Sequence, residues 1–199
     1  EDRKPLILLG ARQVGKTYIL KEFGQREFEN VAYINCDNNA MVKDLFATDY
    51  NIERILLTIG AITGVNIQAG KTLIIMDEIQ ELHRGLASLK YFCEEAREYH
   101  VAVAGSLLGL TLHQGESYPV GKVNTLEMFP MTYEEFLLAR GFKQRVDLLQ
   151  SGMWDVVNSL RTLYIQHLRE YYLVGGMPEA VKKFIDTNDA NAVREVQKE

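Results

Sequence analysis

The residues with the clearest potential for chemistry lie near the start of the chain, in the pattern G-x-x-x-x-G-K-[ST]. An apolar run at 6–9 leads into a loop bounded by two glycines, and a lysine and a threonine follow. Glycines let successive backbone N–H groups turn toward one point, where they can cradle a polyphosphate. The residues expected to bind a nucleotide are Gly10, Ala11, Arg12, Gln13, Val14, Gly15, Lys16 and Thr17. In this pattern the lysine reaches the β- and γ-phosphates and the threonine hydroxyl holds Mg²⁺.

Two adjacent carboxylates, Asp77 and Glu78, end a second apolar run at 72–76. In phosphate-binding-loop proteins an aspartate at the tip of a buried strand holds Mg²⁺, so Asp77 and Thr17 are the expected metal ligands. Glu78 can orient and polarise the water that attacks the γ-phosphate, which makes it a catalytic candidate together with Lys16. The alternative is an acidic cap on the following helix, favourable at the positive end of the helix dipole.

Ser106 ends a third apolar stretch, at 100–105, and is the third catalytic candidate. Its hydroxyl could donate a hydrogen bond to the γ-phosphate or to the attacking water. An ordinary turn residue at the end of a strand is the alternative interpretation.

Apolar runs and helical periodicity alternate along the first two thirds of the chain. The sequence predicts strands at 6–9, 31–37, 72–78, 100–106 and 122–126, and helices at 17–23, 40–47, 52–63 and 82–96. This alternation indicates an α/β fold with right-handed crossovers and a parallel sheet flanked by helices. Ligands bind beyond the carboxyl ends of such strands. We therefore expect Gly10, Asp77 and Ser106 to gather at one edge.

The pattern changes after Pro130. Thr132 and Glu135 form the signature of a capping box, with Met131 and Phe136 placed as its hydrophobic staple. The rest of the chain has helical periodicity. We expect an ATPase core at 1–130 and a helical lid subdomain at 131–199, and because the chain stops within a helical pattern, we expect it to be a fragment of something longer.

Composition limits the classes of partner. The net charge is −5 and the pI is near 5.5, which argues against a nucleic-acid partner, because counterion release needs clustered Lys and Arg. No apolar run approaches the roughly twenty residues that span a bilayer, so no membrane association is expected. Cys36 and Cys93 have no metal-ligand spacing and are expected to be buried thiols. A reducing cytoplasm is therefore the expected location.

Taken in order, several segments resemble the AAA-like ATPases of bacteria and archaea. The segments are Gly10–Thr17, Leu73–Gln80, Ala104–Ser106, Phe129–Phe136 and Tyr172–Glu179. The resemblance covers nearly the whole chain. It implies a P-loop NTPase fold of the additional-strand type: a parallel five-stranded sheet flanked by helices, with the Ser106 strand between the P-loop strand and the Asp77 strand, followed by a small helical lid. In this family the ATPase commonly precedes a nuclease-like C-terminal domain of unknown role.

The resemblance also suggests roles outside the sheet edge. By similarity to signal-transducing ATPases, it implies that the segment 175–178 touches the nucleotide base, and we assign that contact to Pro178. A glycine-capped turn between helices is the alternative. Lys122 stands where relatives often carry an arginine, which leaves the charge-neutralising arginine of this site unassigned. Arg84, Arg97 and Arg140 are the other candidates.

The sequence therefore favours a Mg²⁺-dependent ATPase that binds ATP or ADP and couples hydrolysis to movement of a lid or domain. Its expected partners are an unknown protein, its own C-terminal domain or further copies of itself. The alternative is a nucleotide-switched regulatory module with little turnover.

Overall fold

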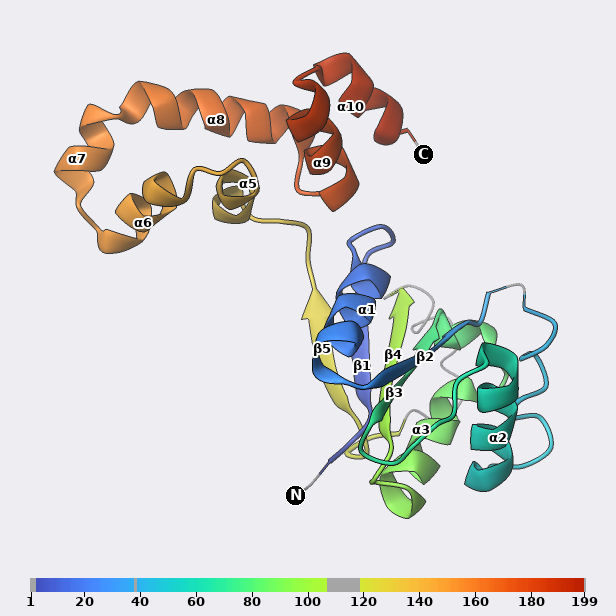
Figure 1. Ribbon diagram of the computed structural model, residues 1–199. Helices are drawn as coiled ribbons and strands as arrows, with labels where there is room; N and C mark the ends of the chain where they lie inside the picture. The colour runs from blue at the N-terminus through green and yellow to red at the C-terminus, as the bar shows by residue number, and fades with distance from the viewer. Residues whose placement is uncertain (1–2, 38, 107–118, 199) are drawn as a thin grey trace. The chain divides into compact units, whose positions relative to one another are not determined.

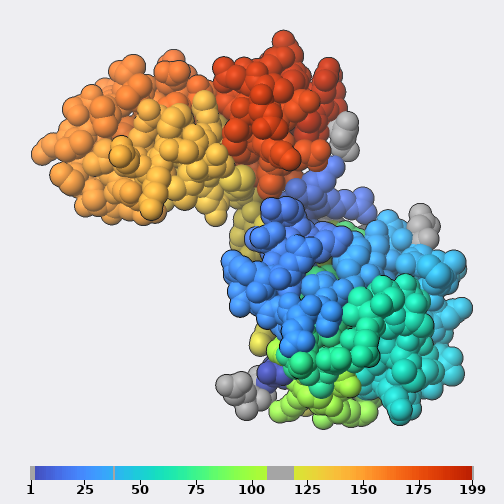
Figure 2. Space-filling model, viewed as in Figure 1, coloured from blue at the N-terminus to red at the C-terminus, as the bar shows by residue number. Residues whose placement is uncertain are grey.

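The structure is a computed structural model that describes residues 3–37, 39–106 and 119–198. The chain divides into two compact units, Glu1–Met128 and Phe129–Glu199 (Figure 1). Each unit is a continuous body of packed side chains (Figure 2). None of the helices in the described ranges is long and apolar enough to cross a membrane.

A five-stranded parallel sheet forms the first unit. Its strands are β1 (Leu6–Gly10), β2 (Asn30–Asn35), β3 (Thr72–Asp77), β4 (His100–Ser106) and β5 (Asn124–Met128). The order across the sheet is β2-β3-β4-β1-β5, so β4 lies between β1 and β3. This order confirms the predicted additional-strand arrangement.

The inner strands β3 and β4 are continuous apolar runs, because both faces of the sheet are covered there. The helices of this unit are α1 (Lys16–Glu27), α2 (Ile52–Thr63), the 3₁₀ turn η1 (Ile79–Glu81) and α3 (Gly85–Glu95). Alternate residues of β3 pack on opposite sides: Ile74 faces the core formed with α2 and α3, whereas Ile75 faces Leu20 of α1. Helices therefore cover both faces of the sheet, as Figure 1 shows.

Two local predictions in this unit were wrong. The first helix was expected to end at residue 23, before Gly24, but α1 continues to Glu27. A Cβ on Gly24 would lie 2.7 Å from Cγ2 of Val31, so the glycine allows close packing of α1 on β2 rather than ending the helix. The segment 40–47 was expected to be helical, but it forms successive i to i+3 turns, among them a bond from Leu45 N to Val42 O of 2.9 Å.

The second unit is helical in all its regular elements. These are α5 (Tyr133–Ala139), α6 (Lys143–Ser151), α7 (Trp154–Ser159), α8 (Arg161–Val174), α9 (Pro178–Thr187) and α10 (Ala190–Val196). The predicted capping box is present at the start of α5: Thr132 Oγ1 accepts from Glu135 N, and Glu135 Oε2 accepts from Thr132 N. Phe136 is fully buried in a cluster with residues of α8, α9 and α10, and Met131 packs against that cluster.

The turn between α8 and α9 depends on close backbone contact at Gly176. Met131 N donates a hydrogen bond of 2.7 Å to Gly176 O, and a Cβ on Gly176 would lie 2.3 Å from Met131 O. The backbone at Met131 precedes the capped α5, so it has little freedom to move away. This contact gives Gly176 a packing role within the second unit.

We expect Gly176→Ala to lower the free energy of unfolding of the second unit by about 1–3 kcal/mol, the usual scale of overpacking. The measurement is chemical denaturation followed by circular dichroism. Lys182→Ala, an exposed change on α9, is the matched control. An alanine at 176 that is as stable as the control would contradict the packing role.

Candidate functional site

Parallel pairing brings the three expected strand ends to one edge of the sheet. Gly10 at the end of β1 pairs in register with Ser106 at the end of β4, and Asp77 at the end of β3 pairs with Ala104. Three segments far apart in the sequence therefore meet where α/β proteins bind ligands.

The loop between β1 and α1 has the backbone that its glycines suggest. A Cβ on Gly10 would lie 2.4 Å from Met128 O, so only glycine fits beside β5. Gly15 has a φ of 98° and Gln13 a φ of 62°. Non-glycine residues rarely adopt the left-handed region, and where they do they often mark functional sites. The side chain of Val14 is fully buried and fixes the loop to the core, whereas Ala11 is exposed.

Lys16 lies within this loop rather than in solvent. It is 5% exposed, and its Nζ donates hydrogen bonds to Gly10 O at 3.1 Å and to Ala11 O at 2.8 Å. α1 begins at Lys16, so the helix dipole and the N–H groups of its first turn, which have no partner within the helix, add positive potential here. A buried ammonium, helical N–H groups and a curved loop are the donor set that a polyphosphate needs, so the site fits a nucleotide.

Thr17 and Asp77 are in direct contact. Thr17 Oγ1 donates to Asp77 Oδ2 at 2.5 Å, and Asp77 is 6% exposed. Hydroxyl and carboxylate oxygens are the ligands that Mg²⁺ prefers, usually together with substrate phosphates and water. This pair therefore fits a magnesium ion, with both predicted ligands on facing elements.

Tyr33 is a site residue that the sequence interpretation missed. Its hydroxyl donates to Asp77 Oδ2 at 3.2 Å, and Lys21 Nζ lies 3.4 Å from the centre of its ring. Burial and then the neighbouring Asp77 raise the pKa of Tyr33 to about 12, so the phenol stays protonated and continues to donate at neutral pH. Only the pairing of β2 with β3 reveals this contact.

Glu78 is held by a second residue that was missed, Gln80. Glu78 has a φ of 52°, and its Oε2 accepts from Gln80 Nε2 at 2.5 Å. Its side chain makes no capping bond to η1, which was the alternative role. Gln80 is 7% exposed, and its Oε1 has no hydrogen-bond partner among the described residues. A reversed amide would place Oε1 against the carboxylate, so the nitrogen must face Glu78.

The remaining predicted residues lie in different places. Ser106 is 6% exposed at the tip of β4, beside the start of the loop. Arg12 is exposed on the loop. Pro178 occupies the first position of α9 in the second unit, after Met177 as the cap. The segment 107–122 is rich in Gly, Ser and His, which predicts a loop, and most of it lies outside the described residues.

The candidate charge-neutralising side chains all have local partners. Arg84 Nε donates to the Tyr50 hydroxyl at 2.9 Å. Arg97 Nε donates to Cys93 O at 2.6 Å. Lys122 Nζ lies 2.8 Å from Glu94 Oε1. In the second unit the guanidinium of Arg140 forms an ion pair with Glu170. Each of these four cationic side chains therefore has a partner within its own unit.

Comparisons with known proteins agree with this fold. The model of a family described as an AAA domain matches residues 2–137. A Walker-type ATPase of Pyrococcus abyssi is similar in structure, with a TM-score of 0.55 and 17% identity over 96% of this chain and 65% of that one. PCH-2 of C. elegans has a TM-score of 0.51 and 11% identity over 97% of this chain and 61% of its own. No curated protein sequence matches.

At these identities the structural likeness shows the fold alone. This chain spans less than two thirds of the length of either structure, since it covers 65% and 61% of them.

Proposed function

The chain belongs to the AAA domain family, which implies ATP binding, and we propose that it is a Mg²⁺-dependent ATPase that couples hydrolysis to movement of its helical part. The observation that supports this most is the buried Lys16 ammonium within the loop, beside the Thr17–Asp77 pair. The proposed location is the cytoplasm, and the proposed partner is another protein or a further copy of the chain.

Each side chain has a distinct part in this proposal. Lys16 exchanges its bonds with the Gly10 and Ala11 carbonyls for phosphate oxygens, and Thr17 and Asp77 hold Mg²⁺. The bound Mg²⁺–ATP supplies an electrophilic γ-phosphorus with its charge partly neutralised. Glu78 takes a proton from the water that attacks the γ-phosphorus, as a positioned base does, and the bond from that phosphorus to the bridging oxygen of the departing ADP breaks. Ser106, at the adjacent strand tip, orients that water or the phosphate.

A second candidate function is a nucleotide-switched module with little turnover. The contact that favours it is the one from Gln80 Nε2 to Glu78 Oε2, 2.5 Å long, which occupies the carboxylate that would act as the base. The experiment that separates the two is to identify the nucleotide that co-purifies and then to measure phosphate release with and without Mg²⁺. Release well above a protein-free control supports the ATPase, and stoichiometric retention of nucleotide without release supports the switch.

We expect Asp77→Asn to weaken nucleotide binding only when Mg²⁺ is present, because Asp77 serves the metal and not the phosphates. Tyr33→Phe should have a smaller effect in the same direction, since it removes one hydrogen bond to Asp77. One such bond contributes about 1 kcal/mol, or about fivefold in affinity. The measurement is calorimetric titration with ATP, with Mg²⁺ and with a chelator.

Tyr18→Phe is the matched control for Tyr33→Phe, because Tyr18 is 73% exposed on α1. Equal losses with Mg²⁺ and with chelator would show that Asp77 and Tyr33 support the fold of the loop rather than a metal.

Pro178 is proposed to contact the nucleotide base. Pro178→Ala should then weaken ATP and ADP binding alike, by about 1 kcal/mol for one lost apolar contact, and leave tripolyphosphate binding unchanged. The competing role is pre-organisation of the first turn of α9, where a missing N–H costs nothing. Competition titrations with the three ligands, together with a thermal melt, separate these roles: unchanged nucleotide affinity with a lower melting temperature would favour the turn.

A further inference from the structure

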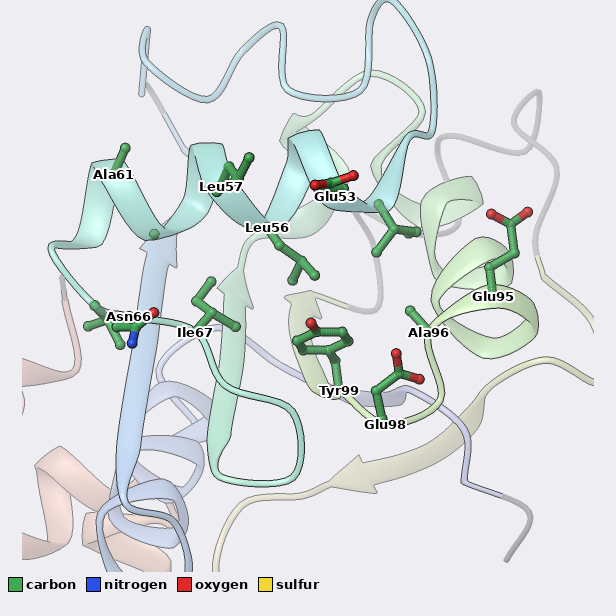
Figure 3. Close-up of a pocket in the computed structure, with 13 residues that line it drawn as sticks. Glu53, Leu56, Leu57, Ala61, Asn66, Ile67, Glu95, Ala96, Glu98 and Tyr99 are labelled. Carbon is green, nitrogen blue, oxygen red and sulfur yellow. The ribbon is translucent and has the colours of Figure 1, made fainter.

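A pocket of about 490 Å³ lies in the first unit, on the side of the sheet covered by α2 and α3 (Figure 3). Its walls are α2, the segment that follows it, and the connection from α3 to β4. Tyr99, one of its lining residues, precedes β4, whereas the candidate nucleotide site lies at the other end of this strand. Seven residues of strand separate the two ends by about 20 Å, so this pocket is a different site.

The floor of the pocket is apolar. Figure 3 shows Leu56, Ile67 and Tyr99 directed into the space below α2. All three are only partly buried, although they pack against the main core. Leu57, on the next position of α2, is 69% exposed and also lines the pocket. A single exposed leucine is common on protein surfaces. Leu57, however, borders a pocket with an apolar floor, so a bound ligand could cover its side chain.

The rim of the pocket is acidic at one end. Glu53 comes from α2, Glu95 is the last residue of α3, and Glu98 follows it. In Figure 3 these carboxylates lie toward one end of the pocket, and Ala61 and Asn66 lie at the other. None of the described residues that line it is a Lys, Arg or His. The pocket therefore combines an apolar floor with a negative potential that no lining cation neutralises.

We propose that this pocket docks a peptide segment of a partner protein in which apolar residues are followed by Lys or Arg. The glutamates attract such a segment and repel nucleic-acid phosphates and anionic membranes. The volume is within the range of about 300–1,000 Å³ typical of binding pockets. A peptide fits better than a small cation because the apolar surface continues from the acidic end past Leu57 to Ala61.

The test uses this chain and a short fluorescein-labelled peptide of leucine and lysine, followed by fluorescence anisotropy. We expect saturable binding that weakens as salt rises. The double variant Glu53→Lys, Glu98→Lys should weaken binding by about tenfold or more, because attraction becomes repulsion. Ala61→Arg, at an exposed lining position, should also weaken binding by filling the neutral end.

Glu22→Lys is the matched control. Glu22 borders another apolar hollow, beside α1, which also contains Arg26. Equal weakening by Glu22→Lys would overturn the assignment, as would equal binding of a peptide with glutamate in place of lysine, or no saturable binding. Binding of free phenethylamine as tight as that of the peptide would overturn it in favour of a small ligand. ATP affinity should be the same in all variants, which separates this test from the proposed ATPase.

Discussion

Replacing Lys16 by alanine is expected to abolish ATP binding while leaving the fold intact. Among the described residues, the ammonium donates hydrogen bonds to two loop carbonyls, Gly10 O at 3.1 Å and Ala11 O at 2.8 Å. Its loss therefore removes the charge that faces the phosphates and little apolar packing. Hydrogen bonds between an ammonium and phosphate oxygens are the strong, charge-assisted kind. Calorimetric titration with ATP gives the affinity, and circular dichroism reports the fold.

Lys71→Ala is a control for the loss of one positive charge. Lys71 is on the surface, where its Nζ lies 3.0 Å from Glu29 Oε1. It should bind ATP as the wild type does. If Lys16→Ala binds ATP with wild-type affinity, the assignment of the phosphate site is wrong. If Lys16→Ala is unfolded, the buried ammonium instead supports the structure of the loop.

The sheet edge could be predicted from the sequence because its information is local. Six consecutive residues of β3 are buried, so the strand appears as an unbroken apolar run that stops at its carboxylate. The glycine pattern of the loop also predicts its backbone geometry, because Gly10 has no room for a Cβ. Parallel pairing then leaves one edge at which the ends of β1, β3 and β4 can meet.

The secondary contacts of this site could not be predicted from the sequence. Each depends either on which strands are neighbours or on a rare backbone conformation. Tyr33 reaches Asp77 only because β2 is the neighbour of β3. Gln80 reaches Glu78 across a turn in which Glu78 adopts a φ of 52°, a conformation that no pattern in the sequence predicts. Likewise, the sequence predicted a helix that ends at 23, and the role of Gly24 within α1 became clear only from the position of Val31 beneath the helix.

In the second unit, too, a feature formed by neighbouring residues could be predicted, and a contact between residues far apart in the chain could not. The capping box at Thr132 and Glu135 is a pattern within four residues, and it is present as predicted. The contact between Gly176 and Met131 joins residues far apart in the chain, and no local pattern reveals it. Gly176 therefore has a structural reason to be glycine that is independent of any nucleotide.

The side chain whose chemistry matters most to the proposed hydrolysis is Glu78. Glu78→Gln is expected to keep the affinity for ATP and Mg²⁺ and to slow hydrolysis by about a hundredfold or more, the usual scale of a positioned base. Glutamine has nearly the same shape, and its amide oxygen can still accept from Gln80 Nε2, so the strand tip should keep its geometry. What is lost is the ability to take a proton from water. Single-turnover phosphate release and calorimetric titration give the two quantities separately.

Glu81→Gln is the matched control, because Glu81 is an exposed carboxylate on the adjacent 3₁₀ turn. It should hydrolyse ATP at the wild-type rate. If Glu78→Gln and Asp77→Asn lose binding equally, the division between a base and a metal ligand is wrong, and the acidic pair is better explained as a structural cap. If the wild type itself releases no phosphate while it binds ATP tightly, Glu78 does not act as a base for hydrolysis. The bond from Gln80 to Glu78 would then be the natural reason for a switch that holds its nucleotide, because it keeps the carboxylate occupied.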